Sequence, residues 1–171
     1  MTTRPPETSH YDVIVIGAGP AGYVAAIRCA QLGFKTACID NWSNANNQAC
    51  PGGTFINAGC ISSMALLESS KIYHLLNNDI SAHGINIDNL AIDLSQMIKR
   101  KDSIIDSLNH QITELFIQNK INCIYGQGKL IAPGKVEVIT KKDSEQYTLN
   151  ADHIILAAGS HSTVLPCAPI D

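Results

Sequence analysis

Apolar and polar positions follow two different periods along the chain, and the change of period divides it into elements. Residues 11–16 form a short run rich in Val and Ile, which is typical of a buried parallel strand. Small and apolar residues at 21–32 predict a helix, with Gly33 at its C-terminal end. Residues 35–39 predict a second strand that ends at Asp40. This order predicts a β-α-β unit.

The middle of the chain shows the helical period. One helical pattern begins around Asn57 and runs to about Leu76. Asp93 is positioned to cap a longer helix that continues to Asn119 and carries one apolar stripe. Between these two helices we expect residues 79–90 to be irregular.

After residue 120 the period changes to that of strands. The expected strands are residues 122–125, 129–132, 135–140, 146–150 and 153–158, with turns at Pro133-Gly134 and Asp143-Ser144. The chain is therefore expected to be α/β: a Rossmann-like three-layer domain over residues 11–171, with a parallel sheet and an added antiparallel β segment. Residues 1–10 are polar and include two prolines, so we expect a disordered tail.

Composition narrows the functional classes. A chain of 171 residues with 45% hydrophobic residues suits one domain with a real core. Its net charge of −3 gives no reason to expect nucleic acid as a partner. No apolar run approaches the roughly 18 residues that span a bilayer, so no membrane association is expected. The N-terminus lacks the apolar core of a signal peptide, which makes the cytoplasm the expected compartment.

The six cysteines are scattered and form no CxxC pair, so we expect no structural zinc site and no metal. Cys29, Cys38 and Cys123 lie in apolar stretches, where buried and inert thiols are expected. A framework of disulfides is not expected without a signal peptide.

Residues 17–22 fit the pattern GxGxxG, which is weak evidence alone but specific when it lies between a strand and a helix. They follow a predicted strand, open a predicted helix and precede an acidic residue at the end of the next strand, as a dinucleotide fingerprint requires. Gly17 permits the tight turn, Gly19 allows close approach of a pyrophosphate, and Gly22 allows the helix to pack on the strand. Asp40 can accept hydrogen bonds from a ribose. A glycine turn without a ligand is the alternative, and the fingerprint alone does not separate NAD from FAD.

A longer segment carries a family resemblance. Residues 52–67, GGTFINAGCISSMALL, closely resemble the active-site segment of dihydrolipoamide dehydrogenases, whose pattern is GGTCxNxGCxPSKALL. Residues 11–32 resemble the N-terminus of that family, and residues 157–160, AAGS, resemble the ATGS strand end that closes its FAD domain. The resemblance covers about residues 10–171.

The resemblance implies FAD as the cofactor. The residues that it implies for FAD binding are Gly17, Gly19, Pro20, Ala21, Gly22, Asp40, Gly52, Gly53, Thr54, Gly128, Ala158 and Gly159. Asp40 stands where the family usually has Glu, and both acids can hold a ribose. Gly128 fits the glycine beside the adenine better than Gly126 does.

The same resemblance exposes departures in the redox centre. Cys60 corresponds to the flavin-proximal cysteine, but Phe55 occupies the position of the cysteine that exchanges with the dithiol substrate. Met64 replaces the lysine that contacts the flavin, Ser62 replaces a proline, and Ala158 replaces the Thr of ATGS. Because a mixed disulfide needs a second thiol to resolve it, Cys60 is expected to be a residual catalytic residue only.

Three interpretations of function remain open. The chain is a truncated or degenerate flavoprotein unable to complete electron transfer between dithiol and NAD; or one subunit of a split disulfide oxidoreductase; or a binding module that has lost FAD. Rescue of the lost thiol by Cys50 is not excluded by the spacing. The family's NAD-binding and dimerisation domains are expected to be absent, and bare surfaces are then expected to drive homo- or hetero-oligomerisation.

Overall fold

The computed structural model describes residues 10–44, 46–78, 80–141, 144–160, 163 and 167. His10 belongs to the first strand, and the rest of the tail expected at 1–10 lies outside the described residues, as does Asp143 of the expected turn. The elements in chain order are β1 (His10–Ile16), α1 (Pro20–Gln31), β2 (Thr36–Asp40), α2 (Gly53–Asn57), α3 (Cys60–Asn78), the 3-10 helix η1 (Ile80–His83), α4 (Leu94–Gln118), β3 (Asn122–Ala132), β4 (Lys135–Thr140) and β5 (Gln146–Leu156).

The predicted β-α-β unit is present. β1 pairs in parallel with β2 on one side and with β5 on the other, and β2 pairs in parallel with β3. The parallel part of the sheet therefore runs in the order β3-β2-β1-β5, and its C-terminal edge is where residues 17–22 and Asp40 emerge.

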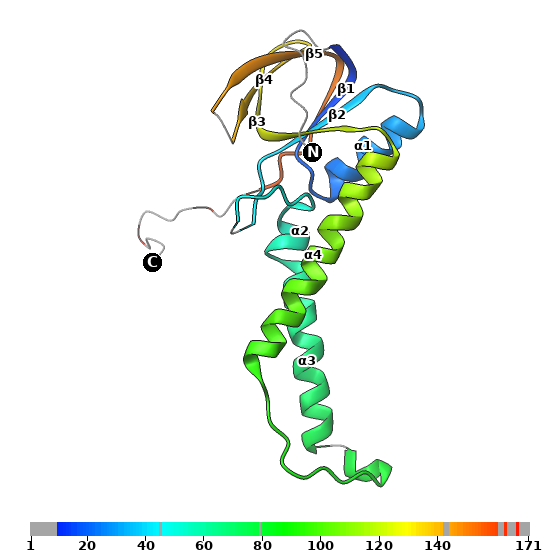
Figure 1. Ribbon diagram of the computed structural model, residues 1–171, viewed down its shortest axis with the longest axis vertical. Helices are drawn as coiled ribbons and strands as arrows, with labels where there is room; N and C mark the ends of the chain where they lie inside the picture. Colours follow the sequence, from blue (N-terminus) through cyan, green and yellow to red (C-terminus); the bar gives the residue numbers. More distant parts are fainter. Residues whose placement is uncertain are drawn as a thin grey trace.

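The antiparallel part closes this sheet into a five-stranded barrel, visible at the upper end of the molecule in Figure 1. β3 pairs with β2 up to Tyr125 and with β4 from Gly126 onward. β5 likewise pairs first with β4 and then, from Asn150, with β1.

Of the five short strands expected after residue 120, residues 135–140 form β4 as expected, and the other four join in pairs into the long strands β3 and β5. The sheet is a closed barrel where a Rossmann-like three-layer arrangement was expected, because β3 and β5 each belong to both the parallel and the antiparallel part. The coarser expectation of a mixed sheet with helices agrees with the structure.

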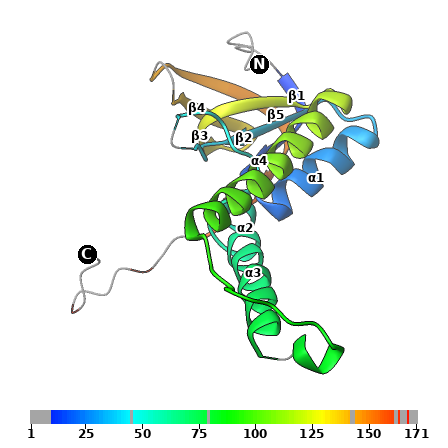
Figure 2. The same cartoon turned by 60° about the horizontal axis from the view of Figure 1, so that its bottom comes forward.

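Two apolar clusters lie on the two faces of the sheet. The barrel interior includes Ile14, Ile39 and Leu149, which are almost fully buried. The outer face is covered by α1 and α4, whose Ala26 and Phe116 pack with β1 and β2 (Figure 2). Successive side chains of a strand point to opposite faces of the sheet, and here both faces are covered by apolar residues. The strands are therefore nearly continuous hydrophobic runs.

Three of the cysteines pack in the outer cluster, as expected for inert thiols. Cys38 is fully buried, while Cys29 and Cys123 are half-buried. Burial raises the pKa of Cys38 well above its ordinary value and that of Cys123 to about 11. Both thiols therefore stay protonated near neutral pH, and the uncharged form is the unreactive one.

The helix expected from about Asn57 to Leu76 is α3, which begins at Cys60 because the chain turns at Ala58 and Gly59 after the short helix α2. A Cβ on Gly59 would lie 2.9 Å from the Thr54 carbonyl oxygen, so the turn is too tight for a side chain there. From this turn, α3 and α4 extend away from the barrel as a long helical arm (Figure 1). Asp93 caps α4 as predicted, by accepting a 3.0 Å hydrogen bond from the Gln96 N–H.

Within the described part of the chain, no helix combines the length and the apolar character needed to cross a bilayer.

Phe116 and Ile117 are neighbours on α4, and substituting each of them tests which face of the helix packs on the barrel. Phe116 is 2% exposed and Ile117 is 68% exposed. Phe116→Ala should lower the free energy of unfolding by about 3–5 kcal/mol, since it leaves a cavity between helix and sheet. Ile117→Ala should change it by less than about 0.5 kcal/mol. Urea unfolding followed by circular dichroism measures both, and equal losses would contradict this packing.

Candidate functional site

The turn between β1 and α1 is fixed by contacts between backbones. The Gly17 N–H donates to the Ile39 carbonyl oxygen at 2.7 Å, and Gly17 adopts a φ of +103°. A Cβ on Gly17 would lie 2.1 Å from the Ala157 oxygen, and a Cβ on Gly22 would lie 1.8 Å from the Gly17 oxygen. Side chains at these two glycines cannot be accommodated, so both serve the packing of strand, turn and helix.

Gly19 differs from Gly17 and Gly22, in keeping with the separate role that its place in the pattern predicts. Its φ of −71° suits any residue, and a Cβ there would come no closer than 3.9 Å to another atom, the Cα of Gly53. The fold does not require glycine here. A missing side chain instead leaves room above the first turn of α1, where N–H groups without helical acceptors favour an anion.

The second glycine-rich segment lies directly against this turn. The Gly52 N–H donates to the Ala18 oxygen at 2.7 Å. Gly53 has a φ of +60°, and a Cβ there would lie 2.8 Å from the Gly19 Cα. α2 begins at this point with Gly53 and Thr54. Two segments about 30 residues apart in the sequence thus form one surface made largely of backbone.

Asp40 lies at the end of β2 beside the same turn. Its Oδ1 accepts a 3.0 Å hydrogen bond from the Ala18 N–H, and its Oδ2 accepts one of 3.4 Å from the Trp42 N–H. Burial raises the pKa of the Asp40 carboxyl, and these N–H groups oppose the rise. The carboxylate is therefore oriented and partly shielded from water.

Gly128 reaches the same edge of the sheet from β3. A Cβ on Gly128 would lie 3.3 Å from side-chain carbons of both Ile16 and Ile39, the last residues before the turn and before Asp40. On the other side, Ala158 borders Gly17, and Gly159 has open space where a side chain would be. The structure thus brings the expected residues to the carboxyl ends of β1, β2 and β5, where open α/β sheets bind ligands.

Tyr125 and Lys141 belong to this neighbourhood but were missed by the sequence analysis. Tyr125 is the strand partner of Asp40, and its buried hydroxyl has no hydrogen-bond partner among the described residues. The Lys141 ammonium lies 5.7 Å from the centre of the Tyr125 ring and donates to the Asn41 oxygen and the Ser43 hydroxyl. Only strand pairing reveals this grouping, since the three segments are far apart in the sequence.

The redox segment occupies the junction of α2 and α3. Cys60 is the first residue of α3 and is exposed. Phe55 on α2 is 42% exposed, and Met64, one helical turn after Cys60, is 64% exposed. Within this segment Cys60 is therefore an accessible thiol bordered in the sequence by apolar side chains.

Cys50 does not pair with Cys60. Both are free thiols, and Cys50 is buried, with its Sγ 3.4 Å from the Gln48 oxygen. Burial raises the pKa of the Cys50 thiol. Its carbonyl oxygen accepts a hydrogen bond from the Asn57 amide, which in turn accepts one from Asn109 on α4. These contacts hold the loop between β2 and α2 against the helical arm, and in this arrangement Cys50 and Cys60 form no disulfide.

Known proteins match this chain over nearly its whole length. A family profile described as pyridine nucleotide-disulphide oxidoreductase matches residues 11–170. Mitochondrial dihydrolipoyl dehydrogenases from Pisum sativum and Sus scrofa are 42% and 41% identical over 94% of the chain. A leghemoglobin reductase from Vigna unguiculata is 42% identical over the same share. The chain spans about 30% of the length of these relatives.

A solved structure has the same fold. It is the Cu(II) complex of the HOCl-induced flavoprotein disulfide reductase RclA from Escherichia coli, which superposes with a TM-score of 0.72 at 24% identity. The match covers 92% of this chain and 30% of that one. The fold agrees with the family profile and with the relatives' high identity. This chain belongs to the pyridine nucleotide-disulphide oxidoreductase family and corresponds to a portion of its dihydrolipoyl dehydrogenase members.

Proposed function

We propose that the chain binds FAD, with the pyrophosphate at the start of α1 between residues 17–22 and 52–54. The observation that carries this proposal is the free space at Gly19. The fold dictates glycine at positions 17 and 22, but at position 19 it does not, so the bare backbone there is explained by a ligand that must approach it. The open helix terminus supplies N–H groups and a partial positive charge for the phosphates.

The adenosine half would lie along the ends of β2 and β3. Asp40 accepts hydrogen bonds and is held in place by the Ala18 N–H, which suits a ribose diol. Gly128 presents no side chain beside Ile16 and Ile39, which leaves room for a flat base. The Tyr125 hydroxyl, buried beside Asp40, offers a polar group in need of a partner.

Bound flavin would supply two-electron redox chemistry, while this chain's own residues bind and orient it. Cys60 would be the nearest thiol to the redox group by the family resemblance. A thiolate at Cys60 attacks a disulfide, forms a mixed disulfide and releases one thiol; a second thiol must then attack to release the other. Phe55 cannot do so. We therefore propose a cofactor-binding protein that does not complete dithiol exchange by itself.

We also propose that the chain resides in the cytoplasm, which is a reducing compartment. All six cysteines are free thiols in the structure, which suits such a compartment.

Gly19→Val tests the cofactor proposal. It should keep the chain folded, because the φ of Gly19 suits other residues and a Cβ there meets no atom closer than 3.9 Å, and should weaken FAD binding by at least about tenfold. Quenching of flavin fluorescence measures the affinity. Ala91→Val places the same side chain at an exposed position in the loop before α4 and should leave affinity unchanged. Absence of binding by the unsubstituted chain, or equal affinity in Gly19→Val, would refute the proposal.

Phe55→Cys tests the account of the redox centre. With FAD, the unsubstituted chain should show no NADH-dependent reduction of lipoamide above a no-protein control. Phe55→Cys should form a disulfide with Cys60 after mild oxidation, seen as two thiols lost in a thiol titration. Leu67→Cys is the control, since two helical turns put it about 10 Å from Cys60, beyond the roughly 7 Å a disulfide spans. Lipoamide turnover by the unsubstituted chain would contradict this account.

We further propose that the helical arm is covered by another polypeptide, most simply a second copy of this chain. On α3, four large apolar side chains are 43–64% exposed: Met64, Leu67, Ile72 and Leu75. Such a patch favours association. A separate chain carrying further domains of a split oxidoreductase is the alternative occupant.

Leu67→Gln should shift the protein toward monomer in light scattering, by removing apolar area from the centre of this patch. Ile117→Gln, on the part of α4 near the barrel, removes an equally exposed side chain and should have no such effect. A monomer at high concentration for the unsubstituted chain would contradict self-association.

A further inference from the structure

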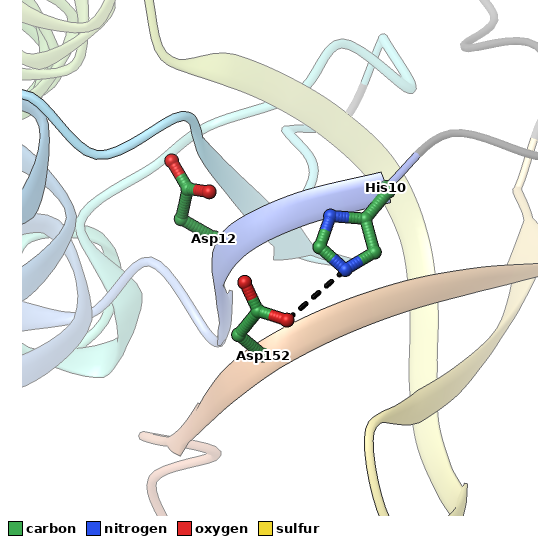
Figure 3. A group of neighbouring side chains, drawn as sticks. All are labelled: His10, Asp12 and Asp152. Atoms are coloured by element: carbon green, nitrogen blue, oxygen red, sulfur yellow. Dashed lines mark ion pairs between the residues drawn. The ribbon is translucent and has the colours of Figure 1, made fainter.

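A cluster of three potential metal ligands lies at the opposite end of β1 from the glycine turn. His10 and Asp12 come from β1 and Asp152 comes from the neighbouring β5 (Figure 3). The His10 Nε2 lies 3.1 Å from an Asp152 oxygen. One ligand atom from each of the three residues lies within 4.8 Å of the other two. The donors therefore already converge on one small volume.

An irregularity shared by both strands produces this convergence. In β1 the residues that face the barrel interior are Tyr11 and then Ile14, three positions apart rather than two. In β5 they are Ala151 and then Ile154, with the same spacing.

The pairing shows the same irregularity. The N–H groups of Asp12 and Val13 both donate to the Lys35 oxygen, at 3.0 and 3.3 Å, which is the pattern of a bulge. Tyr11 pairs with Ala151 and Val13 with His153, so Asp12 lies beside Asp152 outside the barrel.

This placement sets two carboxylates side by side on adjacent strands, an arrangement that destabilises a sheet unless a cation offsets it. Lys35 does not take that role directly. Its ammonium donates to the His10 carbonyl oxygen at 2.7 Å and lies 5.1 Å from the centre of the Tyr11 ring. The Lys35 backbone N–H holds Asp12 through Oδ2 at 2.6 Å. The other oxygen of Asp12 is thereby oriented, as supporting hydrogen bonds orient metal-binding carboxylates.

We propose that His10, Asp12 and Asp152 form a binding site for a divalent metal ion of the zinc class, with water completing the coordination. A tetrahedral ion with bonds of about 2.0–2.1 Å needs its donors about 3.3 Å apart. The His10–Asp152 pair is close to this spacing at 3.1 Å, and an Asp12 oxygen lies within 4.8 Å of both atoms. An imidazole with two carboxylates favours zinc-like ions over Mg²⁺ and Ca²⁺, which prefer oxygen ligands alone.

Such a site would stabilise the pairing of two strands. The ion would fasten the start of β1 to the middle of β5, where the chain enters the barrel, and it would neutralise the paired carboxylates. Because the glycine turn lies at the other end of β1, metal binding and FAD binding are independent of each other in this proposal. The sequence could not indicate the site, since Asp152 is separated from His10 and Asp12 by most of the chain.

Titration calorimetry with Zn²⁺ on the full chain tests the proposal, after alkylation of the accessible thiols so that Cys60 and Cys167 cannot bind the ion. We expect one ion per chain, undisturbed by excess Mg²⁺. Asp152→Asn and Asp12→Asn should each weaken binding by at least about tenfold. Asp12→Asn keeps an oxygen acceptor for the Lys35 N–H, so the fold should persist. Co²⁺ should bind with a spectrum that lacks the thiolate charge-transfer band.

The matched control is His110→Gln. His110 and Glu114 form a similar histidine–carboxylate pair at 3.3 Å on α4, outside the three-residue cluster. This variant should keep full Zn²⁺ affinity, and Asp152→Asn should keep full FAD affinity. The proposal is overturned if the unsubstituted chain binds no Zn²⁺ after alkylation, if neither aspartate variant weakens binding, or if His110→Gln weakens it equally.

Discussion

Close contact between backbone segments at the end of β1 sets the positions of the neighbouring strands and helices. Gly17 and Gly22 allow strand, turn and helix to approach more closely than any side chain permits, and Gly53 brings the next segment onto the same turn. The Gly17 N–H ties the turn to β2, and the Ala157 N–H ties β5 to the end of β1. One small region thus fixes the relative positions of three strand ends and two helix starts, which is the arrangement a dinucleotide site needs.

The closed sheet gives that region a rigid base. β3 and β5 are long enough to pair in parallel with one neighbour and in antiparallel fashion with β4, so the barrel leaves no open edge between its strands. Its interior is filled by apolar side chains, and its outer face is covered by α1 and α4. The same closure brings β5 beside β1, which places Ala158, just after the end of β5, beside the glycine turn and forms the His10 cluster at the far end.

The helical arm is less well packed than the barrel. It projects from the barrel and exposes large apolar side chains along α3, while the accessible Cys60 lies at its base (Figure 1). A thiol at a helix start is ordinarily favoured as a nucleophile. In the proposed function, Phe55 takes the position at which exchange chemistry needs a second thiol. Cofactor binding and dithiol exchange are therefore separate proposals that rest on different residues.

Local patterns in the sequence predicted the β-α-β unit, the glycine turn with its three separate glycine roles, and the Asp93 cap, because each depends on neighbouring residues. They could not predict that separate strand signals join into β3 and β5, since a strand's continuity depends on its partners rather than on its own residues. The turn at Ala58 and Gly59 that delays α3 to Cys60, the position of Tyr125 beside Asp40, and the meeting of Asp152 with His10 became visible only in the folded chain. The last two relations depend on distances between segments remote in the chain, which strand pairing sets and sequence spacing does not.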